Sequence, residues 1–218
     1  MYRKLICIIS AFVSLTANAA VISTEKDINS DNLKHIFGSQ QSMQKLYEVG
    51  SYYESVLERN KGCESKVNII PVAIGIVKPI AYDKSKTYPD SGMWSTRFKL
   101  IRCENTSIYN ALFMAEPDKA PKAIALYPGE SLTDPQLFMD TVQKAVLLLK
   151  ASEEKLLSSC DKKDNIFYIS NTKVSSPVKD GRWAEEWEFK VCTQHKSVLV
   201  EFTPDEKGTK FLVKPLAK

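Results

Sequence analysis

The sequence predicts an α+β fold of two tandem repeats, each with one helix packed on an antiparallel sheet of about four strands and with one disulfide. Three observations support this prediction: a phrase of the form Gly-x-Trp followed by a cysteine occurs twice, four cysteines lie beyond the N-terminal apolar run, and helical and strand-like segments recur with the phrase. A repeat of this size indicates a supersecondary unit that buries its own apolar face.

The repeat is defined by residues that match in type at a constant spacing. The first copy has Gly92, Trp94, Phe98, Cys103 and Phe113, and the second has Gly181, Trp183, Trp187, Cys192 and Phe202, each 89 residues further on. A Pro-Asp pair follows the phrase in both copies, and another cysteine precedes it in both. The first copy has eight extra residues between its cysteines, which we place in the segment 78–88. So many anchors in register indicate a duplication.

The first nineteen residues predict a signal peptide. Arg3 and Lys4 form a basic start, an apolar run covers residues 5–15, and Ala17-Asn18-Ala19 offers the small residues that a signal peptidase requires. The run is too short to span a bilayer, although an uncleaved anchor is the alternative. We therefore expect an exported protein, periplasmic or extracellular, with no stable membrane insertion.

The leader and the repeat divide the chain into three segments. These are the signal peptide at residues 1–19, a first helix-plus-sheet repeat at 20–129 and a second at 130–218. Without the leader, 199 residues remain, with 28 basic and 26 acidic side chains and a net charge of about +2. Nucleic acid binding needs a concentrated basic stripe, which this balance does not supply. We expect no nucleic-acid partner.

Four cysteines remain after the leader, and their even number in an exported chain indicates two disulfides with three possible pairings. The duplication favours Cys63 with Cys103 and Cys160 with Cys192, because each bond would tie the end of a helix to a strand of its own sheet. Strict alternation places Cys103 and Cys192 on the face opposite the aromatic residues. We therefore expect a strand end or a bulge beside each of them.

Each repeat begins with a predicted helix that ends near its first cysteine. In the first repeat, Ser30 or Asp31 caps a short turn, Gly38 interrupts it, Ser39 restarts the helix, and Gly62 is the expected left-handed end. The apolar stripe of this helix consists of Met43, Leu46, Tyr47, Val49, Tyr53, Val56 and Leu57.

The helix of the second repeat has a clear start in the sequence. Thr133 or Asp134 can cap it, and Pro135 suits its first position. Apolar residues then recur at helical spacing, and we expect one long helix that ends near Ser159.

Strand-like segments follow each helix, because they alternate or are rich in branched residues. They cover residues 67–77, 94–103, 108–114 and 122–126 in the first repeat, and 166–173, 183–192, 197–202 and 209–213 in the second. One helix across a curved sheet would bury the apolar faces of both.

The two faces of the strands 94–103 and 183–192 differ in character. One face carries the large aromatic residues, which we interpret as core beneath the helix, although an aromatic stripe can also stack on sugars. On the opposite face, Arg97 and Lys99 of the first copy align with Glu186 and Glu188 of the second. We predict that these four residues take part in binding. If the two faces meet they would pair, and two solvated faces are the alternative.

Candidate catalytic groups are few. His35 and His195 are the two histidines, and neither is repeated. Cys192 lies near His195, but a disulfide cysteine is neither a nucleophile nor a metal ligand. The acidic run at 185–188 could hold the paired carboxylates of a glycosidase, but a charged strand face is the simpler interpretation. The sequence has no Gly-x-Ser-x-Gly elbow, phosphate loop or metal-ligand spacing, so we identify no catalytic or metal residue and expect no cofactor.

Two resemblances add to this interpretation. The tail at 183–213, with Trp-x3-Trp-x4-Cys, then Phe202-Thr-Pro-Asp205 and Gly208, resembles small exported domains of uncharacterised gammaproteobacterial proteins. The tandem plan of helix, sheet and disulfide is similar to that of the secreted β-lactamase inhibitory proteins. The first resemblance covers about thirty residues and implies no activity, and the second concerns the plan alone. Fold analogy cannot assign function.

The sequence thus predicts an exported binding or inhibitory protein that recognises a protein partner. The insertion at 78–88, which we expect to be a loop, breaks the repeat symmetry and carries Tyr82 and Tyr88, which we predict to contact the partner. The alternative is an exported hydrolase with an unobvious carboxylate site, and a structural component of the cell envelope is a third class. An enzyme is the less favoured of these interpretations, and the oligomeric state is not predicted.

Overall fold

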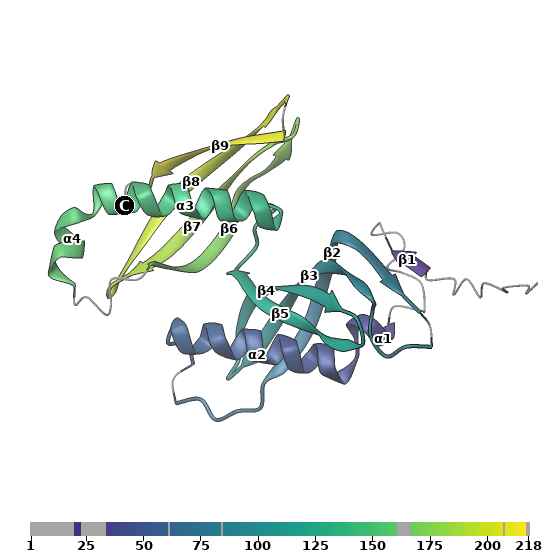
Figure 1. Ribbon diagram of the computed structural model, residues 1–218. Helices are drawn as coiled ribbons and strands as arrows, with labels where there is room; N and C mark the ends of the chain where they lie inside the picture. Colours follow the sequence, from purple (N-terminus) through teal and green to yellow (C-terminus); the bar gives the residue numbers. More distant parts are fainter. Residues whose placement is uncertain are drawn as a thin grey trace, which may run out of the picture.

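The structure is a computed structural model that describes residues 20–22, 34–60, 62–83, 85–160, 167–206 and 208–216. It contains two antiparallel sheets, one in each repeat, and a long helix lies across each sheet (Figure 1). The predicted α+β fold with two similar halves is confirmed. The predicted signal peptide at 1–19 lies outside the described residues.

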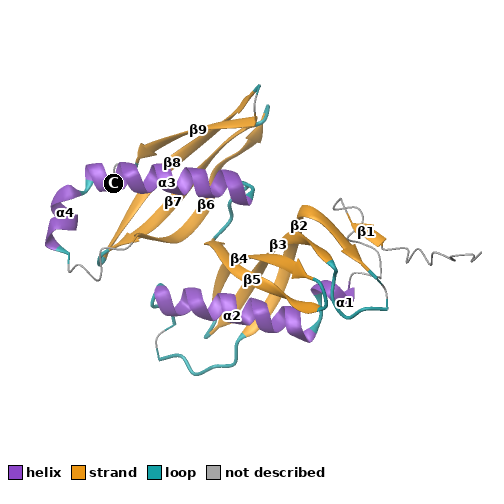
Figure 2. Ribbon diagram, in the orientation of Figure 1, coloured by secondary structure: helices purple, strands orange, loops and turns teal. Residues whose placement is uncertain are grey.

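The first module consists of β1 (Ala20–Ile22), α1 (Lys34–Phe37), α2 (Gln40–Val56), β2 (Asn68–Tyr82), β3 (Ser91–Arg102), β4 (Asn105–Glu116) and β5 (Lys119–Pro128). The second consists of α3 (Pro135–Ser152), α4 (Glu154–Ser159), β6 (Phe167–Lys179), β7 (Arg182–Val191), β8 (Gln194–Asp205) and β9 (Gly208–Pro215). The strands follow chain order in both sheets, β1 to β5 and β6 to β9, so the sheets are simple meanders (Figure 2).

The helix starts agree with the sequence, but two helix ends do not. The Ser39 side chain accepts a hydrogen bond from Ser42 N, and Asp134 accepts from the first backbone N–H groups of α3, so both predicted caps are confirmed. The helix α2 ends at Val56, before the predicted end at Gly62, and the chain already turns at Glu58, with a φ of 55°. Gly62 itself has the predicted left-handed conformation, with a φ of 76°. The predicted single helix to Ser159 is wrong, since a break at Glu153 separates α3 from α4.

Every predicted strand except β7 is longer in the structure, because tight turns connect the strands. β3 ends at Arg102, and Cys103 and Glu104 form the turn to β4 with φ values of 46° and 65°. Cys192 follows the end of β7 in the same way, with a φ of 56°. The expected strand ends beside these cysteines are thus confirmed, and they let each sulfur turn toward the helix end.

The insertion of the first module is partly strand. We expected a loop over 78–88, but β2 continues to Tyr82, with register shifts at Lys78 and Ala81 that mark bulges. The short β1 pairs with this extension, Ala20 opposite Tyr82 and Ile22 opposite Ile80. Only the second half of the insertion connects β2 to β3, so the expectation of a loop over the whole segment is corrected.

Each module has its own core between helix and sheet. The aromatic residues of β3 and β7 supply its largest side chains: Trp94 is 1 % exposed, and Phe98, Trp187 and Phe189 are fully buried. Trp94 stacks on Phe113 with ring centroids 5.3 Å apart, and the equivalent pair in the second module, Trp183 and Phe202, stacks at 4.5 Å. Full burial of such a side chain contributes about 1.5–3 kcal/mol. The interpretation of the aromatic face as core is confirmed.

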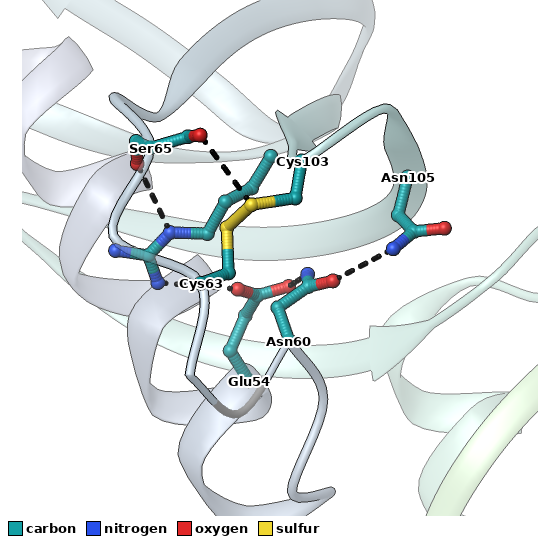
Figure 3. Close-up of a disulfide and its surroundings, with 7 residues drawn as sticks. Glu54, Asn60, Cys63, Ser65, Cys103 and Asn105 are labelled. Atoms are coloured by element: carbon teal, nitrogen blue, oxygen red, sulfur yellow. Dashed lines mark hydrogen bonds and ion pairs between the residues drawn. A yellow bond between two sulfur atoms is a disulfide. The ribbon is translucent and has the colours of Figure 1, made fainter.

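The two disulfides join the predicted partners. Cys63 bonds to Cys103 with Cα atoms 6.3 Å apart, and Cys160 bonds to Cys192 with Cα atoms 6.0 Å apart. The first bond fastens the segment after α2 to the β3–β4 turn (Figure 3). Disulfides of this kind are typical of an oxidising compartment. Among the described residues, no helix is long and apolar enough to cross a membrane.

Candidate binding site between the modules

The connection between β5 and α3 binds directly to the second sheet. Glu130 N donates to Thr172 O at 2.7 Å, and the Thr172 hydroxyl donates to Pro128 O at 2.8 Å. Gly129 must be glycine here, because its φ is 92° and a Cβ atom would lie 2.1 Å from Thr172 O. The end of the first sheet is therefore attached to β6 by two hydrogen bonds, and the close approach leaves no room for a side chain at position 129.

Glu185 fastens the same connection from beneath α3. Its carboxylate is fully buried and accepts three hydrogen bonds, from Leu132 N at 2.8 Å, from Trp183 Nε1 at 2.8 Å and from Trp187 Nε1 at 2.7 Å. Such N–H donors stabilise a buried carboxylate that would otherwise be costly. Glu185 is thus an acceptor that holds the inter-module connection, and its burial under the helix does not fit a catalytic carboxylate open to substrate.

Arg59, three residues beyond α2, reaches from the first module to the second. Its Nη2 donates to Ser170 O at 2.6 Å, its Nη1 lies 3.4 Å from the hydroxyl oxygens of Ser107 and Tyr109, and its guanidinium lies 5.8 Å from the centroid of the Tyr109 ring. Glu58 adds an ion pair with Lys190 at 3.0 Å. These contacts, with those of Glu130 and Glu185, hold the two modules in one arrangement.

A groove of about 640 Å³ lies between the modules, and we call it the inter-module groove. Its lining consists of Arg59, Asn60, Asn105, Thr106, Ser107, Ile108, Gly129, Glu130, Asn171, Thr172 and Lys173. Both modules contribute, because β4 and the segment after α2 form one wall and β6 forms the other. The exposed residues of the lining are Asn105, Thr106, Glu130, Asn171 and Lys173.

One wall of the inter-module groove is fixed by the first disulfide and a chain of polar contacts (Figure 3). Asn105 Nδ2 donates to Asn60 Oδ1 at 3.0 Å, and Asn60 Nδ2 donates to Glu54 Oε1 at 2.8 Å. Glu54 is 5 % exposed, and its other oxygen lies 3.5 Å from Arg102 Nη1. Ser65 Oγ lies 3.4 Å from Cys103 Sγ. The amides of this wall therefore stand in fixed positions before anything binds.

The lining sets the chemistry of the inter-module groove. Hydroxyl and amide groups predominate, Arg59 and Lys173 are cationic, and Glu130 is anionic. Such groups can donate to and accept from a peptide backbone or polar side chains. Within the described part of the chain, no group of three or more His, Cys, Asp or Glu side chains is placed to hold a metal ion.

The predicted charged residues lie on the sheet faces away from the helices, but Arg97 and Glu186 do not pair. The Arg97 guanidinium donates to Asn110 Oδ1 of its own module and to Ser131 O in the connection between β5 and α3. No ion pair among the described residues joins Arg97 to Glu186. Lys99 is exposed, and Glu188 accepts from the Ser170 hydroxyl.

One cluster of polar side chains was not predicted from the sequence, and it consists of Ser170, Glu188 and His195. Ser170 Oγ donates to Glu188 Oε1 at 2.6 Å, and His195 Nδ1 lies 2.9 Å from that oxygen and 3.5 Å from Ser170 Oγ. In a Ser-His-acid triad the two imidazole nitrogens have different partners. Here one nitrogen faces both groups, and Ser170 is 2 % exposed, so the cluster is not arranged as a nucleophilic triad. The register shift at Ser170, between Ile169 and Asn171, lets its hydroxyl reach Glu188, and it has no signal in the sequence.

The two selected tyrosines of the insertion differ in exposure. Tyr82 is 6 % exposed and belongs to the core of the first module, so its side chain is not a surface contact in this structure. Tyr88 is half-buried and lies by Ser39 and Ser42, at the start of α2. Neither residue lines the inter-module groove.

Comparison of the chain with known protein families, with curated proteins and with solved structures finds no match. The resemblances to small exported domains and to the secreted β-lactamase inhibitory proteins therefore stay predictions.

Proposed function

We propose that the protein is an exported binding or inhibitory protein that recognises a protein partner at the inter-module groove. One observation carries the proposal: two modules are held together by direct bonds, and the groove between them presents exposed polar side chains of both, Thr106 from the first and Asn171 and Lys173 from the second. A surface fixed in advance loses little conformational entropy when it binds.

The character of the lining favours a protein over a small ligand. Small-molecule pockets are concave and mostly apolar, with few polar groups. Protein interfaces carry about one hydrogen bond per 100–200 Å² and are rich in polar rim groups. The inter-module groove has hydroxyls, amides and both charge signs along its length, which suits a polar protein surface.

Export rests on two features of the chain. The N-terminal pattern at residues 1–19 is typical of a signal peptide. The two disulfides suit the periplasm or the extracellular space, where they persist. We place the protein in one of these compartments.

The test is capture of partners from periplasmic and extracellular material by the oxidised chain of residues 20–218. Lys173→Glu together with Glu130→Lys inverts the exposed charges of the inter-module groove, whereas Lys214→Glu on β9, outside the lining, is the matched control. We expect a saturable partner whose affinity falls by about tenfold or more in the groove variant and is unchanged in the control. No partner from either source, or equal loss in both variants, would contradict the proposal. The first outcome would favour the hydrolase alternative.

A further inference from the structure

A second groove, of about 400 Å³, lies between α2 and the edge strand β5, and we call it the edge groove. Its walls are Val49, Tyr52 and Tyr53 on α2, and Ala123 and Ala125 on β5. The Tyr52 side chain is 52 % exposed at its mouth. None of these residues lines the inter-module groove, so the two are separate sites.

The duplication shows what is missing from the edge groove. Phe113 stands opposite Ala123, while its counterpart Phe202 stands opposite Phe211. In the same way Ala111 stands opposite Ala125, while Val200 stands opposite Val213. Ala123 and Ala125 therefore occupy the positions that Phe211 and Val213 fill in the second module, where both pack against the core. The second module fills this space with its own side chains, and the first leaves it open.

The backbone beside the edge groove is able to accept another strand. β5 is the last strand of its sheet, and over 119–127 it pairs with β4 alone within the described residues. An edge strand presents N–H and C=O groups in a row, which an added strand can satisfy. Pro121 lies near the start of β5, so the stretch 122–127 is the part of the edge with a full set of donors.

The charge at the edge groove favours an occupant with a basic residue. Glu48 is the charged residue of the lining, and it forms an ion pair with Lys45 at 2.8 Å. A Lys or Arg beside the inserted apolar side chains would share this carboxylate with Lys45. In β9 the residues that correspond to the missing side chains are flanked by Lys210 and Lys214, so the chain itself contains a segment with the required pattern.

We propose that the edge groove binds an extended segment of a protein partner, which adds to the edge of β5 and places an aromatic and a branched aliphatic side chain, two residues apart, beneath α2, with a basic residue near Glu48. This proposal rests on the proposed function, because both require a protein partner. Side chains at alternate positions of a strand project to one face, which is why the two insertions are two residues apart.

The probe is the peptide Gly-Thr-Lys-Phe-Leu-Val-Lys-Pro, the sequence of β9, titrated into the oxidised chain of residues 20–218. We expect saturable binding with a dissociation constant below about 1 mM, detected by chemical-shift changes at Ala123, Ala125 and Tyr52. A peptide with Ala in place of Phe should bind at least about tenfold more weakly.

Variants of the protein separate the edge groove from other surfaces. Ala123→Phe fills the groove as the second module does and should weaken peptide binding at least about tenfold. Ala125→Val is a milder filling variant, Tyr52→Ala removes an exposed wall, and each should also weaken it. Ala151→Phe, at an exposed position of α3, is the matched control and should leave binding unchanged.

Two results would overturn the inference: no saturable binding up to about 1 mM, or equal affinity of the wild type and all three groove variants. The test is distinct from that of the inter-module groove. If the peptide binds but no partner is captured, the edge groove stands and the proposed function falls. If a partner is captured but the peptide does not bind, the reverse holds.

Discussion

The buried carboxylate of Glu185 gives the sharpest prediction about what holds the modules together. Glu185→Ala would leave three N–H donors without an acceptor, and the indole N–H of Trp187 lies in the core. Each buried donor left unsatisfied costs about 1–3 kcal/mol. We expect a loss of about 4–6 kcal/mol, close to the whole stability of a small domain.

Glu185→Gln refines this prediction. The amide oxygen can still accept from two of the three donors, but the amide NH₂ would face the third, so we expect a loss of about 2–3 kcal/mol. The neighbouring Glu186→Gln on the opposite face of β7 is the matched control and should change stability by under about 0.5 kcal/mol.

Equilibrium unfolding in guanidinium chloride, followed by tryptophan fluorescence, measures these losses. The indole protons of Trp183 and Trp187 should exchange slowly in the wild type and faster in the Glu185 variants, because Ala removes their acceptor and Gln leaves one donor without an acceptor. A Glu185→Gln protein as stable as the Glu186→Gln control would refute the reasoning.

Three further predictions concern the disulfides, the inter-module contact and pH. Replacing Cys63 and Cys103 together with Ala should cost about 4 kcal/mol, because the bond closes a separation of 40 residues; equilibrium unfolding measures this, and an unchanged midpoint would contradict it. Arg59→Ala should lower the free energy of unfolding by about 2 kcal/mol, because it removes the charge-assisted hydrogen bond to the second module, and Arg59→Lys should restore little of this loss. Hydrogen exchange of the β6 amides should become faster in both variants, and unchanged exchange would contradict the prediction. Burial raises the pKa of Tyr53 and of Tyr127 above the value of 10.0 for an exposed tyrosine. The stability that both contribute is therefore complete below about pH 10 and is lost as the pH rises further. Tyrosinate absorbance that appears for both residues before the protein unfolds would contradict this.

Much of each module could be predicted because its signals are local. The caps at Ser39 and Asp134 use a side chain and backbone groups two or three residues away, and the pairing of the cysteines follows from the duplication. The break at Glu153 and the bulges of β2 lack such signals, because the fit of helix and strand to the rest of the module decides them.

The site between the modules depended on contacts that are distant in sequence. Arg59 and Ser170 are 111 residues apart, and the acceptor is a backbone carbonyl that any residue would provide. Glu185 had a usable signal, since alternation places it on one face with Trp183 and Trp187. A carboxylate that alternates with two tryptophans along a strand could have been recognised as an acceptor for their indole N–H groups, and the acidic neighbours Glu186 and Glu188 obscured it. The edge groove became visible only once the strand register aligned Ala123 with Phe211.

The central claim is that both modules contact one partner across the inter-module groove. Photo-cross-linking residues at Thr106 and Asn171, one on each wall, test it directly, with the exposed Met139 of α3 as the control position. The account predicts that both groove positions cross-link to the same protein and that position 139 does not. Cross-links from position 139 alone, or different partners at the two walls, would contradict it.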